Sequence, residues 1–342
     1  MKERLWGVAY IADEESEKIR PLLCAAVEYH RRQEAFLIPH SYWTDKKGQL
    51  YLRWNLQGNP QGQEERPVWR YWFDEAGELQ AEEIPRKLSR TELLRGVGSS
   101  APVVLITGDT HRNFTRIIQF CNRFHTTKED VLVILGDAGI NFLGGDKDIR
   151  VKERLAQLPI TLFCIHGNHE KRPESVGTYR MVDWHGGAVY VEDAFPNLLF
   201  AKDGEIYDIA GKKTIVIGGA YSVDKWYRLE RQMSWFADEQ PSAKIKAYVE
   251  EQLQKKGWRV DVVLSHTTPY QYRPMDRFMP EIDQGSVDTS TEEWLTRIEN
   301  RLSYEKWYAG HYHCDRRVDK LQIMYRKVEL FGKDTELGFE MT

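Results

Sequence analysis

The 342-residue sequence predicts an α/β protein that begins with a small α+β domain. Three observations lead to this prediction. Residues 1–95 are dense in aromatic side chains, residues 96–102 are rich in Gly, Ser and Pro without periodicity, and from residue 103 short apolar runs alternate with helical stretches. Strands that are buried on both faces read as short continuous apolar runs. We therefore expect domains at 1–95 and 103–342, joined by a linker at 96–102.

The first 95 residues contain one predicted helix and two predicted strands. Residues 21–33 carry apolar side chains at helical spacing, and Pro21 is tolerated in a first turn, where a backbone N–H has no partner. Residues 49–56 and 67–73 alternate as strands do. Aromatic residues at alternating strand positions usually fill a core, so we expect a structural role or contact with a protein partner. Stacking on nucleic-acid bases is the alternative, and nearby acidic stretches weaken it.

The second domain supplies the elements of an alternating α/β fold. Six apolar runs are typical of buried strands: 103–107, 131–135, 160–165, 214–217, 260–264 and 307–309. Helical periodicity appears between several of them, at 114–124, 147–157, 243–255 and 291–302. Polar motifs follow several of the strands. Open α/β sheets assemble their sites in the loops beyond the carboxyl ends of strands, so these motifs are expected to meet at one sheet edge.

Composition narrows the classes of partner. The formal charge of −4 arises from 48 basic and 52 acidic residues, so no global field draws the protein to nucleic acid or to an anionic membrane. A local basic groove for nucleic acid stays possible. No apolar run approaches the roughly 20 residues that cross a bilayer, and the start lacks the apolar core of a signal peptide. We expect a cytoplasmic protein without membrane contact. The four scattered cysteines indicate neither a disulfide framework nor a thiolate zinc site.

Five short motifs at strand ends offer oxygen and imidazole nitrogen donors. Their polar members are Asp109, His111, Asp137, Asn168, His169, Glu170, His266, His311 and His313. A pair of divalent metals about 4 Å apart requires a carboxylate that bridges them, further donors on each side and open positions for water and substrate. The motifs meet this demand. Because Asp109 and His266 are far apart along the chain, only convergence of loops at one sheet edge brings them together.

The motif order Asp-x-His, Gly-Asp, Gly-Asn-His-Glu, His and Gly-His-x-His resembles the calcineurin-like metallophosphoesterase superfamily over residues 102–326. Each motif alone is weak, whereas five in this order, each after an apolar run, are specific. The resemblance implies a four-layer α/β/β/α sandwich. It also implies two metals, one held by Asp109, His111, Asp137 and His313 and the other by Asp137, Asn168, His266 and His311, with Asp137 as the bridge.

The resemblance, together with the chemistry of paired cations, implies a mechanism. Two cations lower the pKa of a bridging water towards about 7, and the hydroxide attacks a phosphate mono- or diester in line. In the family, the histidine after the asparagine ligand stabilises the phosphoryl group or protonates the leaving group, and His169 occupies that position. Glu170 either orients His169 or caps a turn. Oxygen and nitrogen ligands suit Mn, Fe, Zn, Ni and Mg, and family resemblance favours Mn.

Departures from the family pattern bear on the substrate. Phosphoprotein phosphatases carry Asp and Arg three and four residues beyond the bridging Asp, where this sequence has Ile140 and Asn141. They also carry an Arg before the Gly-Asn-His-Glu motif, where His166 stands. These departures argue against a protein Ser/Thr phosphatase, and we expect a small-molecule or nucleotide phosphodiesterase. A metal-dependent nuclease and a non-catalytic scaffold that has kept the fold are the alternatives.

Two segments between the motifs are candidates for contact with a small phosphorylated substrate. The insertion between Gly167 and His266 contains three cations that could bind phosphate: Lys225, Arg228 and Arg231. Ordinary surface charge is the alternative explanation for them. Residues 267–288 follow a ligand strand without periodicity, and they are either a substrate lid or a plain connection.

Overall fold

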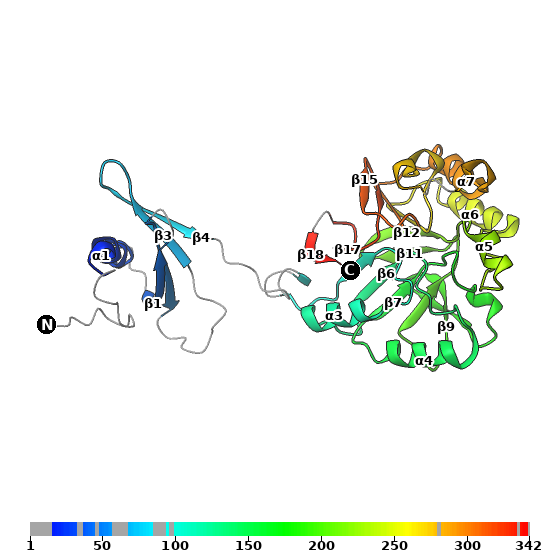
Figure 1. Cartoon of the computed structure of the whole chain (residues 1–342), viewed down its shortest axis with the longest axis horizontal. Coiled ribbons are helices and arrows are strands. Elements are labelled where there is room, and N and C mark those ends of the chain that lie inside the picture. The colour runs from blue at the N-terminus through cyan, green and yellow to red at the C-terminus, as the bar shows by residue number, and fades with distance from the viewer. Residues whose placement is uncertain are drawn as a thin grey trace. The chain divides into compact units, whose positions relative to one another are not determined.

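The computed structural model describes residues 16–32, 37–44, 48–56, 68–84, 94–95, 99–278, 282–333 and 336–340. The chain divides into two compact units, Met1–Ser89 and Arg90–Thr342, which Figure 1 shows. This division precedes the boundary that we expected after residue 95. Leu94 is buried in a core of the larger unit, and the Arg95 guanidinium pairs with the Asp130 carboxylate at 2.5 Å. Residues 94–95 therefore pack with the larger unit.

The smaller unit is an antiparallel four-stranded sheet with one helix against it. Its elements are α1 (Ser16–Arg32), β1 (Leu37–Thr44), β2 (Leu50–Leu56), β3 (Val68–Phe73) and β4 (Leu79–Ile84), with the strands in that order. The expected α+β character is confirmed. The helix begins five residues earlier than predicted, so Pro21 lies inside it and not in its first turn.

Aromatic side chains fill the core of the smaller unit. Trp54 and Tyr71 are buried, and the Trp54 indole donates to the Tyr71 hydroxyl at 2.9 Å. His30 is also buried, with its Nε2 2.6 Å from the same hydroxyl. These three polar groups satisfy one another inside an apolar cluster, as buried polar atoms require. The aromatic density of this region therefore serves packing among the residues that the structure describes.

The larger unit contains two sheets. The eight-stranded sheet has the order β18 (Glu336–Glu340), β17 (Lys327–Leu330), β5 (Val104–Thr107), β6 (Val131–Ile134), β7 (Thr161–Cys164), β10 (Leu198–Ala201), β9 (Gly187–Val191) and β8 (Arg180–Trp184). The six-stranded sheet has the order β11 (Ile206–Ile209), β12 (Lys212–Ile217), β13 (Val262–Ser265), β14 (Lys306–Ala309), β16 (Leu321–Ile323) and β15 (Arg316–Val318). Strands β5, β6, β7 and β10 are parallel, as are β12, β13, β14 and β16.

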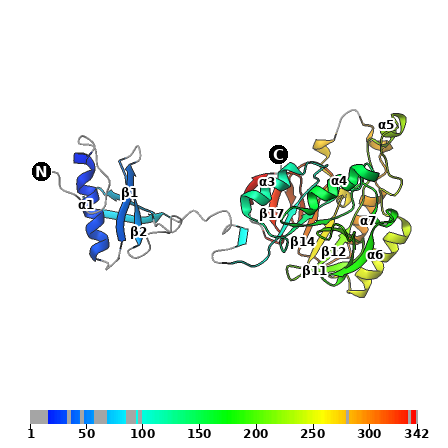
Figure 2. The ribbon, with the colours of Figure 1, turned by 90° about the horizontal axis from the view of Figure 1, so that it is seen from below.

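Helices cover the outer face of each sheet, as Figures 1 and 2 show. Helices α3 (Thr115–Phe124) and α4 (Gly145–Ala156) pack on the eight-stranded sheet, and α6 (Ala243–Lys255) and α7 (Ser290–Glu299) on the six-stranded one. Alternation along the strands separates the layers. Leu105 of β5 faces the helices, whereas its neighbour Ile106 faces the core between the sheets. The predicted four-layer α/β/β/α sandwich is confirmed.

The predicted strands are locally apolar, but β10, which is equally apolar and buried, was not among them. All six predicted strands and all four predicted helices of this unit occur within three residues of their expected bounds. The antiparallel strands at the sheet edges, such as β8 with its mostly exposed or half-buried side chains, escaped prediction because they carry no continuous apolar run. None of the described helices is both long and apolar enough to span a membrane.

Candidate metal centre

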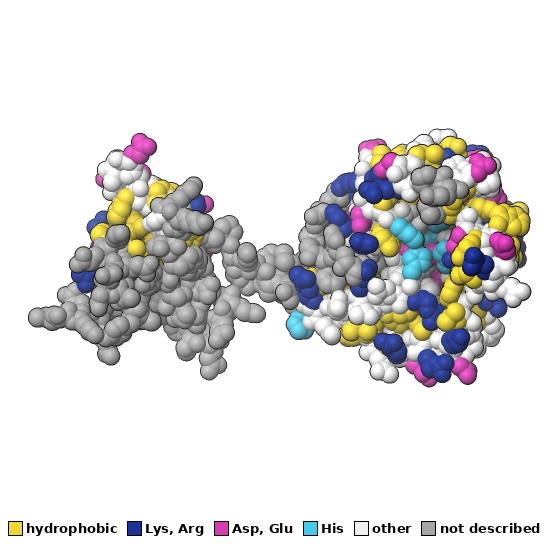
Figure 3. Space-filling view, in the orientation of Figure 1, with side chains coloured by type: hydrophobic (Ala, Val, Ile, Leu, Met, Phe, Trp, Pro, Cys, Tyr) yellow, Lys and Arg dark blue, Asp and Glu magenta, His cyan; other side chains and the backbone are white. Residues whose placement is uncertain are grey.

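The loops that follow five parallel strands converge at one edge of the two sheets. Asp109 follows β5, Asp137 follows β6 and Asn168 follows β7, while His266 and His311 follow β13 and β14 of the other sheet. The carboxyl ends of parallel strands lie at the same edge, so each loop delivers its polar side chain to a common point. All seven predicted ligands and His169 are found there. Figure 3 shows the histidine side chains gathered in a hollow of this face.

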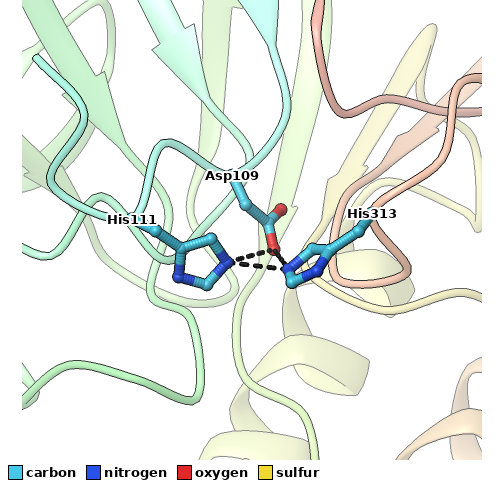
Figure 4. Close-up of side chains that lie close together, drawn as sticks. All are labelled: Asp109, His111 and His313. Carbon is cyan, nitrogen blue, oxygen red and sulfur yellow. Dashed lines mark hydrogen bonds and ion pairs between the residues drawn. The ribbon is translucent and has the colours of Figure 1, made fainter. Parts of the chain in front are cut away.

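One half of the centre is formed by Asp109, His111 and His313, which Figure 4 shows pointing at one another. Asp109 Oδ2 lies 3.6 Å from His111 Nε2 and 3.5 Å from His313 Nε2, and the two Nε2 atoms are 2.7 Å apart. Asp109 Oδ2 is buried and has no hydrogen-bond partner. A buried carboxylate oxygen without a partner is costly, and a cation among these three atoms would remove that cost.

The Asp137 carboxylate lies between this half and a second one. Its Oδ2 atom is 3.9 Å from His111 Nε2 and 3.7 Å from His266 Nε2. Its Oδ1 atom accepts a hydrogen bond from the His169 backbone N–H at 2.8 Å, which fixes the orientation of the carboxylate. One oxygen of Asp137 therefore faces donors on both sides, as a bridging ligand must.

The second half consists of Asn168, His266 and His311. Asn168 Oδ1 lies 2.8 Å from His266 Nε2 and 3.1 Å from His311 Nδ1. His266 Nδ1 is 2.7 Å from the Leu135 carbonyl oxygen, so this nitrogen carries the proton and donates it. In the neutral ring, Nε2 then carries a lone pair and accepts hydrogen bonds. It faces the Asn168 amide oxygen, which is also an acceptor. Such an arrangement suits a cation between the two atoms, and these residues fit a metal.

The acid–base states of the ligands suit metal binding. Burial raises the pKa of the Asp109 carboxyl, but the attraction of the nearby imidazoles, led by that of His313, outweighs burial, and the net pKa is lowered. Burial, followed by the charge of His266, holds the pKa of His311 well below its usual value. The adjacent Asp109 carboxylate raises the pKa of His313. Metal ligands must be deprotonated, and Asp109 and His311 already are at neutral pH.

The backbone of the ligand loops adopts a conformation that side chains other than glycine rarely take. The φ angles are 43° at His111, 47° at Asp137, 69° at His311 and 48° at His313. Each such residue costs of order 1 kcal/mol and persists only where its surroundings hold it. Strained residues of this kind gather at functional sites, and here four of the seven predicted ligands have the strain.

Two motif glycines let carboxylates approach the backbone closely. A Cβ atom on Gly167 would lie 2.0 Å from Asp137 Oδ1, and one on Gly310 would lie 2.4 Å from Asp109 Oδ1. Both distances are shorter than non-bonded atoms tolerate. The glycines of Gly-Asn-His-Glu and Gly-His-x-His are thus required by the packing of the two aspartates, in addition to any turn that they make.

Comparison with known proteins identifies the family. A family model of the calcineurin-like phosphoesterases matches residues 102–315. The chain belongs to the calcineurin-like phosphoesterase family. No curated protein matches the sequence. Among solved structures, TT1561 of Thermus thermophilus is 10% identical, with 66% of this chain and 89% of that chain covered and a TM-score of 0.39. That likeness is too weak to carry an argument.

Membership of the calcineurin-like phosphoesterases implies a metal-dependent phosphoester hydrolase with two divalent metals. Two groups of three donors lie close enough together to hold a cation: Asp109 with His111 and His313, and Asp109 with Asp137 and His266. Asn168 Oδ1 adjoins the second group, because it lies 2.8 Å from His266 Nε2 and 3.1 Å from His311 Nδ1. Their individual roles as ligands stay predictions, which metal titration tests.

The two residues that follow Asn168 behave differently. His169 is half-buried and lines the cavity above the ligands, with its ring centroid 5.8 Å from that of His111. Glu170 is buried, and its carboxylate accepts from the Gly139 and Gly167 backbone N–H groups at 3.2 and 3.3 Å. Burial, followed by the charge of Asp137, raises the pKa of Glu170 to about 8. Of the two expected roles of Glu170, its contacts match turn capping.

A cavity of about 400 Å³ opens above the ligands in this phosphoesterase. Arg273 and Arg277 give the cavity positive charge, and its apolar wall consists of Phe278, Ile282 and Val287. All five belong to the segment 267–288 that we considered as a lid, which forms three short 3₁₀ turns in its described part. Sequence analysis missed the two arginines. The only available signal was the position of this non-periodic segment after His266.

The three cations predicted to contact phosphate do not line this cavity. Lys225 Nζ lies 4.5 Å from the Trp235 ring centroid, and Arg231 packs over the Tyr227 ring at 4.7 Å. The Arg228 guanidinium pairs with the Asp224 carboxylate at 2.7 Å. Asp224 lines the cavity, whereas Arg228 does not. Arg273 and Arg277 are therefore the better placed cations, and a phosphate contact by Lys225, Arg228 or Arg231 stays an untested prediction.

The positions that depart from the phosphoprotein phosphatases have packing roles. Ile140 lies in the core beneath the helices. Asn141 is buried and accepts from the Tyr179 hydroxyl at 3.1 Å. His166 is buried, and desolvation, followed by the charge of Arg172, holds its pKa well below the usual value. None of these three residues supplies a charged clamp for phosphate.

Proposed function

We propose that this chain hydrolyses phosphate mono- or diesters of small molecules, with nucleotides among the substrates. The observation that carries the proposal is the position of Asp137 Oδ2, 3.9 Å from His111 Nε2 and 3.7 Å from His266 Nε2, at the floor of a cavity. A carboxylate that serves two donor groups is the feature that paired divalent metals require. When bound, two divalent cations would supply an activated hydroxide and offset the charge of the phosphoryl oxygens.

His169 is proposed to contact the phosphoryl group. Burial is the largest influence on its pKa, which is lowered, so the imidazole is neutral at pH 7 and keeps one N–H to donate. Its ring lines the cavity next to Asp137, and its own backbone N–H holds the Asp137 carboxylate. The family histidine either stabilises the phosphoryl group or protonates the leaving group. A neutral imidazole supports the first role, in which His169 donates a hydrogen bond to a phosphoryl oxygen.

The cavity supports a small substrate. Its volume of about 400 Å³ lies within the range of roughly 300–1,000 Å³ that is usual for small-molecule sites. Arg273 and Arg277 offer charge for the phosphate or for a second anionic group, while Phe278 stacks against Tyr312 at a ring distance of 6.0 Å and offers an apolar wall. A compact phosphate ester with an apolar or aromatic portion fits both features.

Further proposals rest on composition and family resemblance. Manganese is the proposed metal, with Fe, Zn, Ni and Mg as alternatives, because oxygen and nitrogen ligands accept all five. A cytoplasmic location is proposed because the four cysteines are free and form no disulfide framework. For the smaller unit we propose contact with a protein partner and not with nucleic acid. Its aromatic residues Trp54 and Tyr71 are packed in its own core, so they are not available to stack on bases.

Hydrolysis assays test the proposed function. Bis-(p-nitrophenyl) phosphate and p-nitrophenyl phosphate are compared first, then cyclic and linear nucleotides, plasmid DNA and single-stranded DNA, each with Mn²⁺ and with the other metals. Turnover of small esters without DNA cleavage is expected. Cleavage of DNA at a higher kcat/KM than any small ester would establish the nuclease alternative. Full activity in excess EDTA after dialysis would refute the metal mechanism, and no turnover with any metal would favour a scaffold.

A further inference from the structure

A residue outside the predicted motifs holds Asn168 from behind. Asn168 Nδ2 donates to Ser222 Oγ at 2.9 Å, and both residues are buried. Ser222 lies in the loop after β12, so the contact joins the two sheets of the sandwich. An asparagine amide can present either its oxygen or its NH₂ group to a cation, and only the oxygen binds. The partner on the far side of the amide therefore decides whether Asn168 serves as a ligand.

Ser222 alone does not settle this choice, because a hydroxyl both donates and accepts. A buried carboxylate, Glu239, lies beyond it. Burial raises the pKa of Glu239, and hydrogen bonds from the Ser222 hydroxyl, from the Ser222 backbone and from Trp235 oppose that rise. The Trp235 indole N–H donates to Glu239 Oε2 at 2.8 Å, which holds the carboxylate in place. The carboxylate accepts from all of these donors.

We propose that Glu239 and Ser222 form a directional relay that turns Asn168 Oδ1 towards the metals. The Ser222 hydroxyl accepts from the Asn168 NH₂ group at 2.9 Å, and its own proton is directed to the Glu239 carboxylate, so Ser222 offers only a lone pair to Asn168. A lone pair accepts from the amide N–H and repels the amide oxygen, which leaves Oδ1 facing His266 and His311. Ser222 and Glu239 are positioning residues. The relay rests on the proposed two-metal function. It acts on the half of the metal centre that contains Asn168.

Backbone contacts hold the relay loop in place. Gly219 N–H donates to the His166 carbonyl at 2.8 Å, and Ala220 N–H donates to the Glu239 carbonyl at 3.2 Å. Gly219 has a φ of 88°, and a Cβ there would lie 2.4 Å from the Glu239 carbonyl oxygen, so only glycine permits this approach. The neighbours Tyr221 and Val223 line the substrate cavity. One loop therefore orients a metal ligand and forms part of the substrate wall.

Metal titration of chelator-treated protein tests the relay without relying on turnover. The variants Ser222→Ala and Glu239→Gln are titrated with Mn²⁺ by calorimetry, next to wild type. We expect one of the two binding steps to weaken by about 10–100-fold, the usual effect of removing a group that orients a ligand, while the other step changes little. Ser222→Thr keeps the hydroxyl and should restore binding. Ser303→Ala and Glu251→Gln, at exposed positions, are the matched controls.

The outcomes separate the relay from the proposed function. Wild type that takes up no Mn²⁺ would overturn both. Wild type that binds two ions while Ser222→Ala and Glu239→Gln bind them with the same affinities would overturn the relay alone, as would equal weakening of both binding steps. If Ser222→Ala fails to fold, Glu239→Gln and Trp235→Phe decide. Trp235→Phe removes the indole donor from Glu239, and we expect it to weaken the same step by less than Glu239→Gln does.

Discussion

The two halves of the metal centre differ in how the protein holds them. The half with His111 and His313 is open, with side-chain exposures of 34% and 49%, whereas the His266 side chain in the other half is 0% exposed. His266 is held by the Leu135 carbonyl and Asn168 by Ser222. Among the described residues of the open half, the His313 ring stacks on the Tyr325 ring at a centroid distance of 4.8 Å, and no hydrogen bond to His111 Nδ1 or His313 Nδ1 is present.

The comparison shows that the ligands of the two halves are preorganised differently, although both halves adjoin the Asp137 carboxylate. In the buried half, hydrogen bonds from behind select the tautomer and the amide orientation. In the open half, His111 and His313 are held by backbone at positive φ, as His311 also is in the buried half. A cation in the open half is reached by solvent, so it should exchange faster than one in the buried half. Asp137 couples them, and its loss should affect both.

Replacing the shared carboxylate should have the largest effect. Asp137→Asn keeps the shape but removes the charge that faces both donor groups, so we expect turnover to fall by more than about 10³-fold and Mn²⁺ content to drop from two ions to one or none. Elemental analysis and a diester assay measure the two quantities. Asp146→Asn, on the exposed start of α4, is the control. A Mn²⁺ content that stays at two ions would show that Asp137 does not bridge.

His169 lies beside both halves and is proposed to belong to neither. His169→Ala should lower kcat by about 10²–10⁴-fold, the usual scale for a positioned proton donor or acceptor, and leave the Mn²⁺ content at two. Single-turnover kinetics and elemental analysis on the same preparation check this. Metal loss equal to that of Asp137→Asn would mean that the His169 side chain is itself a ligand.

Stability of the metal-free protein should separate the halves by burial. His266→Ala opens a cavity at a fully buried position and leaves the Leu135 carbonyl without its donor, so the free energy of unfolding should fall by about 2–4 kcal/mol. His313→Ala removes a half-exposed ring and should cost less than about 1 kcal/mol. Urea unfolding in excess EDTA measures both. Equal losses would show that the contrast in burial has no energetic consequence.

The smallest expected effect is a difference in pH dependence between the two binding steps. His313 has a raised pKa and gains a proton as the pH falls, so a cation must displace that proton, and binding in the open half should weaken by up to about tenfold per pH unit below the pKa of His313. His311 has a strongly lowered pKa and stays neutral over the same range, so it adds no such penalty to the buried half. Mn²⁺ titrations between pH 6 and pH 8 test the contrast. If the Mn²⁺ affinities of the two steps fall equally with pH, the proposed difference between the halves is wrong.

Much of the fold follows from local patterns. The runs that became β5, β6, β7, β13 and β14 are mostly apolar, because both faces of these strands are covered, and helical periodicity marked α3, α4, α6 and α7. The edge strands have no such signature. Packing rather than local spacing also decided that Leu94 and Arg95 belong to the larger unit, because their partners lie far along the chain.

For the candidate site, the sequence by itself determined the donors: their types, their order and their positions after apolar runs. Chemistry makes that possible, since oxygen and imidazole ligands are residue types and strand ends are local features. Only the tertiary structure decided which atom of each donor faces the centre, which half is buried, that Arg273 and Arg277 enter the cavity, and that Ser222 stands behind Asn168. Those contacts join residues on different strands and loops, and their geometry depends on how two sheets pack, which no spacing along the chain encodes.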